Sequence, residues 1–524
     1  MTERRLRSGD VILSVNPGHD GAVVAIKDRK LLFSWEAEHD SHPRHALVAA
    51  GSLLNAMNAL DAVPAVIARS GWAPDETNYE STDLSYHGCE DSFARIRETN
   101  VLGRPAVLFE STHERSHIFC SYGLSPFEEG RPFYALVWEG EIGSFYEVDE
   151  AMHVSRLGPV LPYPGYKYSF LFDLADPKSP MGVWRFDAAG KLMALAAFAS
   201  DNEPTAQELR VIDRIFERVT PPTTDKHPFR DTPYFNCGHA HPRFRDLVAR
   251  FSDALFGRYY AYAQKHLRKG YPLAIGGGCG LNCEWNARWR DSGMFSDVFV
   301  PPVANDSGTA IGTAIEAQFA LSGSAKVDWS VYSGPEFVWD GQTDGFEEHP
   351  GDYDEIAALL LEDKVIAWVQ GRTEIGPRAL GARSMLASPF RAAMKDRLNC
   401  IKQREPYRPI APVCMEEDAE RLFGVKSSPY MLYFQPACAP ELEAVTHVDG
   451  SARVQTVSRE QNAPLHELLS AFKRRTGFGV LCNTSLNRKG KGFINRSSEL
   501  FAFARERRLD AVVANGHCWV SPPA

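Results

Sequence analysis

Short apolar segments alternate along this chain with longer amphipathic ones, and this alternation constrains the fold more than any other feature. Strand-like segments lie at residues 11–15, 22–26, 31–35, 106–109, 133–138 and 273–275, and helix-like segments lie at 205–219, 243–269 and 310–320. Residues 27–30, between two of the strands, predict a hairpin turn. Alternation of this kind is typical of α/β proteins, so the chain is predicted to have an α/β fold.

A polar stretch rich in Gly and Asp, residues 339–353, interrupts the pattern and has neither helical nor strand periodicity. A new helix-then-strand pattern follows it at residues 356–361 and 365–369. The chain has 524 residues, enough for more than one domain with a full core. We therefore predict two domains, residues 1–345 and 352–524.

Composition argues against several classes of protein. The formal net charge of −10 offers no electrostatic footprint for a nucleic acid. No apolar run approaches the ~18 residues of a membrane span. The N-terminus lacks an apolar signal core, which predicts a cytoplasmic protein. None of the ten cysteines forms a CxxC pair, so we expect free thiols rather than a structural zinc site.

The first candidate site follows the first strand, where Gly18, His19, Asp20 and Gly21 form a glycine-flanked turn. Glycines let backbone amides approach a phosphate or acyl group, and the turn presents two polar side chains at the strand end. Histidine is the side chain best suited to move a proton near neutral pH. The alternative is an ordinary turn that happens to carry two polar residues.

Residues 113–117 read His-Glu-Arg-Ser-His. If this segment is helical, His113 and His117 share one face and could bind one metal ion. The letters also match the HExxH pattern of zinc proteases, in which Glu114 would be the general base. Two surface histidines on a helix are the structural alternative.

Carboxylates and glycines mark two more strand ends. Glu139 ends the strand at 133–138 and is followed by a Gly-rich turn at 140–143. Three consecutive glycines at 276–278 lie between a strand and a helical stretch, an arrangement that makes room for a nucleotide. Asp306 precedes an Ala-rich helix and could either cap it or bind a metal. Two histidines with carboxylates would suit iron, manganese or zinc.

Cations gather in the second half of the chain, in turns rich in Gly and Pro. They are Arg372, Arg378, Arg383, Lys402, Arg404 and Arg408. Solvated arginines usually lie on helix faces, so this placement predicts a phosphate-binding pocket in which guanidinium groups hold oxyanions. Arg453 and residues 481–487 add donors at predicted strand ends. The alternative is a structural salt-bridge network with Glu374 and Glu405.

Taken in order, these motifs resemble the O-carbamoyltransferase family of nodulation-factor and antibiotic-tailoring enzymes, and the resemblance covers nearly the whole chain. Its most specific segments are Gly-Pro-Arg-Ala-Leu-Gly at 376–381, residues 404–409, and Asn-Thr-Ser at 483–485. Residues 16–21 and 137–140 look most like the branch that acts on ansamycin, macrolide or cephem antibiotics.

The resemblance implies an actin/hexokinase-like ATPase N-terminal domain, similar to tRNA threonylcarbamoyl transferases. An α/β C-terminal domain similar to the carbamoyl-adenylate-forming fold would follow it. In the family, the C-terminal domain converts carbamoyl phosphate and ATP to carbamoyl-adenylate, which passes to the N-terminal domain for attack by a hydroxyl of a small natural product. The implied cofactors are ATP with Mg²⁺ and a divalent metal, typically Fe²⁺. Neither nucleic acid nor membrane is an expected partner, and a homodimer stays open.

The resemblance also implies residue roles. His19 would accept the proton of the attacking hydroxyl, with Asp20 beside it. The metal ligands would be His113, His117, Glu139 and Asp306, although Asp is more common in the family at position 139. Nucleotide contacts in the first domain would be Gly140, Gly143, Lys191, Gly276, Gly277, Gly278 and Asn282. Contacts to carbamoyl phosphate and ATP in the second domain would be Arg378, Lys402, Arg408, Arg453, Asn483 and Ser485. The loop at 487–492 is more basic than is usual in the family.

Two alternatives from other classes stay open: a nucleotide-dependent sensor, and carbamoylation of a macromolecule such as tRNA or a hydrogenase-maturation protein. A sensor needs no second oxyanion pocket, and the acidic charge disfavours tRNA. The lack of CxxC knuckles disfavours the maturation type. The aromatic stretch at 163–168 and Trp184 are candidates for lining the acceptor pocket.

Overall fold

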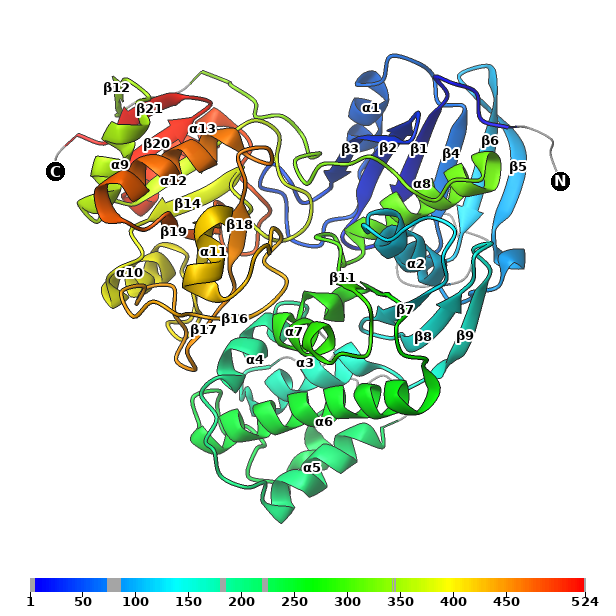
Figure 1. The fold of residues 1–524 in the computed structure, drawn as a ribbon, viewed down its shortest axis with the longest axis horizontal. Helices are drawn as coiled ribbons and strands as arrows, with labels where there is room; N and C mark the ends of the chain where they lie inside the picture. Colours follow the sequence, from blue (N-terminus) through cyan, green and yellow to red (C-terminus); the bar gives the residue numbers. More distant parts are fainter. Residues whose placement is uncertain are drawn as a thin grey trace. The chain divides into compact units, whose positions relative to one another are not determined.

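The computed structural model describes residues 5–72, 86–179, 185–218, 225–341, 343 and 345–522. Helices and strands alternate along these residues in a mixed α/β fold, which confirms the predicted fold class (Figure 1). The chain forms two compact units. The first comprises Met1–Gly88, Ser92–Leu124 and Pro301–Ala524, and the second comprises Cys89–Asp91 and Ser125–Val300. This partition differs from the two predicted domains, whose boundary stays a prediction.

The N-terminal part of the first unit is a six-stranded sheet in the order β3-β2-β1-β4-β6-β5. Its strands are β1 (Val11–Asn16), β2 (Ala22–Lys27), β3 (Lys30–Glu36), β4 (Val66–Ser70), β5 (Arg95–Val101) and β6 (Arg104–Ser111). β1 pairs antiparallel with β2 and parallel with β4. Its nearly continuous apolar sequence suits a strand that is covered on both faces. The predicted hairpin is confirmed, because β2 and β3 pair and turn at Asp28 and Arg29, which both have positive φ.

Two helices bring site residues to the end of this sheet. α8 (Ser307–Ser322) packs against β1, β2 and β4, and α2 (His113–Gly123) packs against α8. A Cβ atom at Gly312 would lie 1.7 Å from the carbonyl oxygen of Ser116, so glycine lets the two helices approach closely. A shorter helix, α1 (Ala50–Asn58), packs against β2.

The C-terminal part of the first unit is an eight-stranded sheet in the order β12-β21-β20-β13-β14-β19-β15-β18. Its strands are β12 (Glu347–His349), β13 (Ile366–Val369), β14 (Arg383–Ala387), β15 (Ala411–Met415), β18 (Gln455–Val457), β19 (Val480–Ser485), β20 (Ala511–Ala514) and β21 (His517–Val520); a separate ribbon pairs β16 (Gln435–Pro436) with β17 (Ser451–Ala452). β12 falls inside the stretch at 339–353 that was predicted to be a linker, so part of that stretch is an edge strand.

Five helices accompany this sheet: α9 (Tyr353–Leu361), α10 (Ala392–Ile401), α11 (Glu416–Phe423), α12 (Ala463–Thr476) and α13 (Ser497–Arg507). One apolar cluster joins α9 and α12 to the strands, and a second cluster joins α10, α11 and α13 to them. Side chains alternate along β13 between the two clusters, since Ile366 and Trp368 enter one and Ala367 and Val369 enter the other.

The second unit contains a five-stranded sheet in the order β11-β10-β7-β8-β9. Its strands are β7 (Phe133–Trp138), β8 (Gly143–Val148), β9 (Val154–Pro159), β10 (Leu273–Gly276) and β11 (Val298–Phe299). Its helices are α3 (Pro164–Ala175), α4 (Ala188–Ala196), α5 (Ala206–Phe216), α6 (Pro242–His266) and α7 (Cys283–Asp291). The predicted order of strand, glycines and helix is present, because a 3-10 turn at Gly278–Leu281 connects β10 to α7. Trp184 lies outside the described residues.

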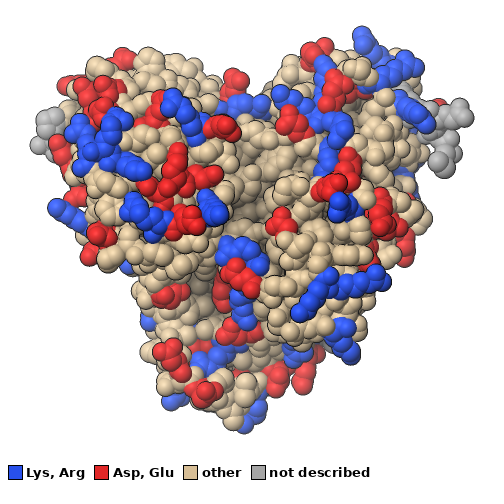
Figure 2. Space-filling view, in the orientation of Figure 1, with Lys and Arg blue, Asp and Glu red and all other residues tan. Residues whose placement is uncertain are grey.

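Cysteine pairing, helix composition and surface charge complete the description of the fold. All ten cysteines are free thiols. Among the described helices, none combines the length and the apolar character that crossing a membrane requires. On the face shown in Figure 2, Lys and Arg side chains are intermingled with Asp and Glu rather than gathered in one extended patch.

Candidate active site

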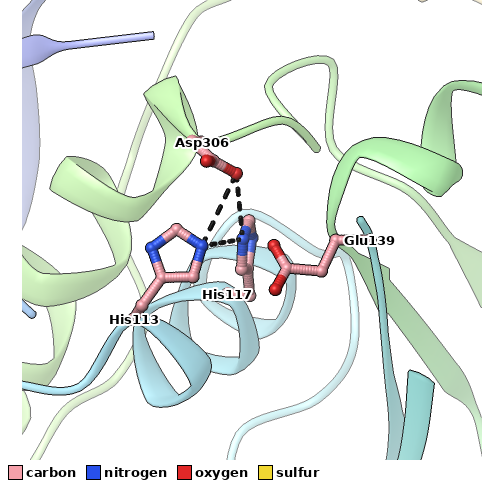
Figure 3. Close-up of side chains that lie close together, drawn as sticks. All are labelled: His113, His117, Glu139 and Asp306. Atoms are coloured by element: carbon pink, nitrogen blue, oxygen red, sulfur yellow. Dashed lines mark hydrogen bonds and ion pairs between the residues drawn. The ribbon is translucent and has the colours of Figure 1, made fainter. Parts of the chain in front are cut away.

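Three buried side chains of the first unit converge at the N-terminal ends of α2 and α8 (Figure 3). His113 Nε2 lies 3.1 Å from His117 Nε2, and Asp306 Oδ1 lies 3.6 Å from the former and 3.4 Å from the latter. The two histidines are one turn apart on α2 and therefore share a face. The prediction that residues 113–117 are helical is confirmed, and the alternative of surface histidines is wrong because both are buried.

Asp306 is held by its backbone rather than by its side chain. It occupies the N-cap position of α8, but its carboxylate makes no capping hydrogen bond. Its carbonyl oxygen accepts hydrogen bonds from Asn16 Nδ2 at 3.0 Å and from Thr309 Oγ1 at 2.7 Å. Burial alone would raise the pKa of Asp306, but the nearby imidazoles of His113 and His19 hold that pKa well below its usual range. The geometry thus favours a ligand role over a capping role.

These three side chains fit a divalent cation. Two imidazole nitrogens and one carboxylate form a mixed N/O donor set of the kind that iron, manganese and zinc accept. The His113 ring is fixed by Tyr86, which stacks on it with a centroid distance of 4.1 Å. The fourth predicted ligand, Glu139, also drawn in Figure 3, is a buried residue directly after β7 in the second unit, and its role stays a prediction.

His19 and Asp20 lie in the turn after β1. His19 Nδ1 is 3.0 Å from Asp20 Oδ2 and 3.3 Å from Asp306 Oδ2. The side chain of Asn16, the last residue of β1, donates to the carbonyl oxygens of His19 at 3.2 Å and Asp20 at 3.3 Å. The ring of Trp72 meets that of His19 edge-on at 4.9 Å. The polar turn is therefore an organised part of the site.

The two residues of this turn have shifted pKa values. Burial would lower the pKa of His19, but the carboxylates of Asp306 and Asp20 outweigh it and raise that pKa to about 8. Burial would raise the pKa of Asp20, yet hydrogen bonds from His19 and His45 lower it. Because His19 Nδ1 faces carboxylates, Nε2 is the nitrogen suited to accept a proton.

Several residues of the predicted nucleotide site in the second unit have structural roles. A Cβ atom at Gly277 would lie 2.5 Å from the carbonyl oxygen of Trp138, and its φ of +94° favours glycine. A Cβ atom at Gly143 would lie 2.0 Å from the hydroxyl of Tyr259. Asn282 caps α7 by accepting two backbone N–H groups at 3.1 and 3.2 Å. Packing and capping thus account for these three residues without a ligand.

The remaining members of that set are less constrained. Gly276 ends β10, and a Cβ atom at Gly278 would meet nothing within 4 Å. A Cβ atom at Gly140 would touch the ring of Tyr166 at 2.7 Å. Lys191 Nζ pairs with Asp187 Oδ2 at 2.5 Å. Nucleotide binding by these residues stays a prediction.

Lys402 is the centre of the C-terminal candidate site. Its ammonium group donates to the carbonyl oxygen of Ser485 at 2.6 Å, to Ser485 Oγ at 3.1 Å and to the carbonyl oxygen of Asn487 at 3.0 Å. Burial, followed by the positive charges of Arg404 and Arg408, lowers its pKa well below the usual range. Asn487 Oδ1 also accepts from Ser485 Oγ at 2.7 Å. Asn487 was predicted only as the first residue of a basic loop, so its contacts with Lys402 and Ser485 were not predicted.

Three arginines add to this positive charge. Burial, followed by the charges of Arg408 and Arg453, lowers the pKa of Arg404 to about 9. Arg404 Nε donates to Asn399 Oδ1 at 2.5 Å, and Arg408 lies 4.0 Å from Glu405. The positive charges of these arginines repel one another, so a bound anion would stabilise them.

Asn483 and the loop that carries Arg378 meet nearby. Asn483 Nδ2 donates to the carbonyl oxygen of Ala379 at 3.0 Å and to Gln455 Oε1 at 2.9 Å. Glu374 Oε1 accepts the backbone N–H of Leu380 at 2.6 Å, so this buried carboxylate folds the loop. Glu374 is therefore mainly a hydrogen-bond acceptor for the backbone of this loop. This contact argues against the alternative in which Glu374 is chiefly a salt-bridge partner of the arginines.

One of the six cations, Arg383, is structural, which corrects the expectation that all six line an oxyanion pocket, and Arg372 also makes contacts with protein oxygens. Arg372 donates to the carbonyl oxygens of residues 334 and 333 at 2.9 and 2.8 Å. The wholly buried Arg383 donates to the carbonyl oxygens of residues 370 and 371 at 3.1 and 2.9 Å, and to Asn495 Oδ1 at 2.7 Å. Protein oxygens accept from all three nitrogens of the Arg383 guanidinium, so this group is not available to a phosphate, whereas a phosphate contact by Arg372 stays a prediction.

An α/β scaffold with a buried imidazole–carboxylate centre and a cluster of half-buried cations is typical of an enzyme. A family model described as "Carbamoyltransferase N-terminus" matches residues 83–315, and one described as "Carbamoyltransferase C-terminus" matches residues 357–521. The chain belongs to the carbamoyltransferase family, as its motifs suggested. The family assignment rules out the zinc-protease alternative. Glu114, which would be the general base of such a protease, accepts a hydrogen bond from the backbone N–H of Gly88 at 2.7 Å.

Named relatives match over nearly their full length. The chain is 46% identical to a 3'-hydroxymethylcephem-O-carbamoyltransferase of Amycolatopsis lactamdurans, covering 97% of this chain and 99% of the relative. It is 44% identical to the protein of the same name in Streptomyces clavuligerus, covering 97% and 98%. Nodulation protein U of Sinorhizobium fredii is 32% identical, covering 97% and 98%.

Solved structures resemble the chain more distantly. The activator of 2-hydroxyisocaproyl-CoA dehydratase from Clostridium difficile, with bound ADPNP, matches with a TM-score of 0.34 and 11% identity over 60% of this chain and 96% of that one. A ROK family glucokinase from Streptomyces griseus matches with a TM-score of 0.29 and 11% identity over 58% and 98%.

Proposed function

We propose that this carbamoyltransferase uses ATP and carbamoyl phosphate to carbamoylate a hydroxyl of a small molecule of the hydroxymethylcephem type. The observation that carries the proposal is 46% identity, over 97% of the chain, to a relative whose name states that acceptor. Iron(II) as the metal and a cytoplasmic location are part of the same proposal.

The first half-reaction is assigned to the cations of the C-terminal part. Arg378, Arg408 and Arg453 would hold the anionic oxygens of carbamoyl phosphate and ATP, and Lys402, whose ammonium group donates to Ser485 and Asn487, would position Ser485 and add positive charge. Water takes up the phosphoryl group of carbamoyl phosphate, which leaves carbamate and phosphate. A carbamate oxygen then replaces pyrophosphate on the α-phosphorus of ATP and gives carbamoyl-adenylate. Asn483 and Ser485 would position these groups.

The second half-reaction is assigned to the turn after β1. The acceptor hydroxyl oxygen attacks the carbamoyl carbon, its proton passes to His19 Nε2, and the bond to AMP breaks. Asp20 accepts the Nδ1 hydrogen bond of His19 at 3.0 Å and so fixes the orientation of the ring. A divalent cation held by His113, His117 and Asp306 would supply positive charge to stabilise the departing phosphate oxygens.

The test is product formation with purified enzyme, carbamoyl phosphate, Mg-ATP and a 3′-hydroxymethylcephem, followed by liquid chromatography and mass spectrometry. We expect the carbamate ester of the acceptor, with AMP and pyrophosphate as co-products. Formation of ADP in place of AMP would contradict the adenylate route. Carbamoylation of other hydroxylated natural products, with none of the cephem, would contradict the proposed acceptor class.

A further inference from the structure

A second histidine approaches Asp20. His45 Nδ1 lies 3.0 Å from Asp20 Oδ1 and 3.1 Å from Asp20 Oδ2, while His19 Nδ1 lies 3.0 Å from Asp20 Oδ2. The two imidazole rings are 6.3 Å apart and nearly perpendicular, with an interplanar angle of 85°. One buried carboxylate therefore takes a hydrogen bond from each of two histidines that are far apart in sequence.

The backbone at both ends of this contact has an unusual conformation. Asp20 has a φ of 52° and His45 has a φ of 61°, in the left-handed region that residues other than glycine seldom adopt. Surrounding contacts must hold such a backbone in place. The backbone N–H of His45 donates to Glu38 Oε2 at 3.2 Å, and the backbone N–H of Gly21 donates to the carbonyl oxygen of Ala46 at 2.9 Å. Strained residues held in this way often serve a site.

The segment that carries His45 is also bound to the C-terminal part of the same unit. Three backbone hydrogen bonds of 2.9–3.0 Å join it to the loop after β19: Ser41 N–H to the carbonyl of Phe493, Arg44 N–H to that of Gly490, and Gly492 N–H to that of His42. Arg44 pairs in addition with the buried Glu38 at 3.0 Å. His45 is thus presented to Asp20 from a loop that is fixed at several points.

We propose that His45 is a positioning residue for the transfer step, which holds the Asp20 carboxylate so that Asp20 in turn orients the His19 ring. This inference rests on the proposed function. A carboxylate that is bound by one imidazole alone can rotate about its Cβ–Cγ bond, whereas donors on both oxygens fix it. The orientation of the His19 ring, and hence the direction in which Nε2 points, depends on that carboxylate.

Two substitutions at one position separate the hydrogen bond from the backbone. Asparagine tolerates a left-handed backbone and places an amide N–H near the position of the histidine Nδ1, so His45→Asn keeps both features. Glycine tolerates the backbone without strain but has no donor, so His45→Gly removes the imidazole and its hydrogen bond to Asp20 while the left-handed backbone stays accessible. His42→Asn, in the exposed part of the same segment, is the matched control.

For His45→Gly we expect kcat for carbamoyl transfer to fall about tenfold, a size typical of losing an orienting partner, with KM for the acceptor unchanged. Carbamoyl-phosphate-dependent exchange of pyrophosphate into ATP should stay within about twofold, because it does not use His19. His45→Asn should restore most of kcat, and His42→Asn should behave as wild type.

Two results would overturn the inference. The first is equal carbamoyl transfer by His45→Gly and the wild type. The second is an equal loss of carbamoyl transfer and pyrophosphate exchange in His45→Gly, which would indicate a structural role only. Failure of the wild type to carbamoylate any hydroxylated acceptor would instead overturn the proposed function. Double substitution with Asp20→Asn adds a check: the two losses should not be additive if His45 acts through Asp20.

Discussion

The side chain of Glu36, the last residue of β3, accepts a hydrogen bond of 2.5 Å from the backbone N–H of Gly376. This contact joins the N-terminal sheet to the loop that carries Arg378, within one compact unit. Gly376 has a φ of +87°, and a Cβ atom there would lie 2.2 Å from the carbonyl oxygen of Pro302. The loop can therefore take this path only with glycine at position 376.

Replacing Gly376 with alanine should be strongly destabilising. The added methyl group meets a backbone oxygen and the residue must keep a left-handed φ, so we expect a loss of about 2 kcal/mol or more in unfolding free energy. Gly371→Ala is the control, because Gly371 also has a positive φ of +49° but nothing lies within 4 Å of its Cβ position. It should lose only about 1 kcal/mol. Equal losses in chemical denaturation would contradict the steric account.

Stability should depend on the ionisation of Glu36. Burial, followed by the negative charge of Glu38, raises the pKa of Glu36 to about 8, against an ordinary value of 4.5. The folded state then holds a proton that the unfolded state releases between these values, so the unfolding free energy should fall as the pH rises from about 5 to 8. The slope for one such proton is at most about 1.4 kcal/mol per pH unit.

Glu36→Gln removes this titration while keeping an oxygen that can accept the Gly376 N–H. We expect urea denaturation of wild type and variant to diverge over that pH range, with the wild type losing stability relative to Glu36→Gln. The charges of Asp20 and Arg44 also face Glu36, so the comparison is made between these two proteins at each pH. A constant difference at all pH values would show that Glu36 is ionised throughout.

Much of this fold could be predicted from sequence because local pattern determined it. The strand at 133–138 coincides with β7, and the hairpin at 22–35 turns where its polar residues lie. β12 was missed because Glu347–His349 has no apolar alternation and is a strand only through its pairing with β21. Edge strands of this kind depend on their partner.

The candidate site was predictable where one short motif supplies its chemistry. The spacing of His113 and His117 fixed their common face, whereas the engagement of Arg372 and Arg383 by carbonyl oxygens depends on contacts that composition cannot reveal. His45 was not predicted for a similar reason. It lies 25 positions after Asp20, and no motif connects the two residues.

Removing the paired histidines should remove bound metal. The double variant His113→Asn/His117→Asn keeps polar side chains but loses both imidazole donors, so metal content measured by inductively coupled plasma mass spectrometry should fall to background. His153→Asn, which changes an exposed histidine, should retain the wild-type content. Retention of metal by the double variant would rule out the centre at α2 and α8.

His19→Asn should separate the two half-reactions. The asparagine amide can still donate to Asp20 but has no counterpart of Nε2, so transfer to the acceptor should fall at least about 100-fold. Carbamoyl-phosphate-dependent pyrophosphate exchange should continue near the wild-type rate. If both activities decline together, the proposed division of labour between the two sites is wrong.

The most direct test of the account concerns Arg378 and the activation of carbamoyl phosphate. Labelled pyrophosphate exchange into ATP is measured with and without carbamoyl phosphate for the wild type, Arg378→Ala and the exposed control Arg391→Ala. We predict exchange that requires carbamoyl phosphate in the wild type and the control, and none in Arg378→Ala, because a phosphate contact is lost. Undiminished exchange in Arg378→Ala, or wild-type exchange that does not need carbamoyl phosphate, would contradict the account.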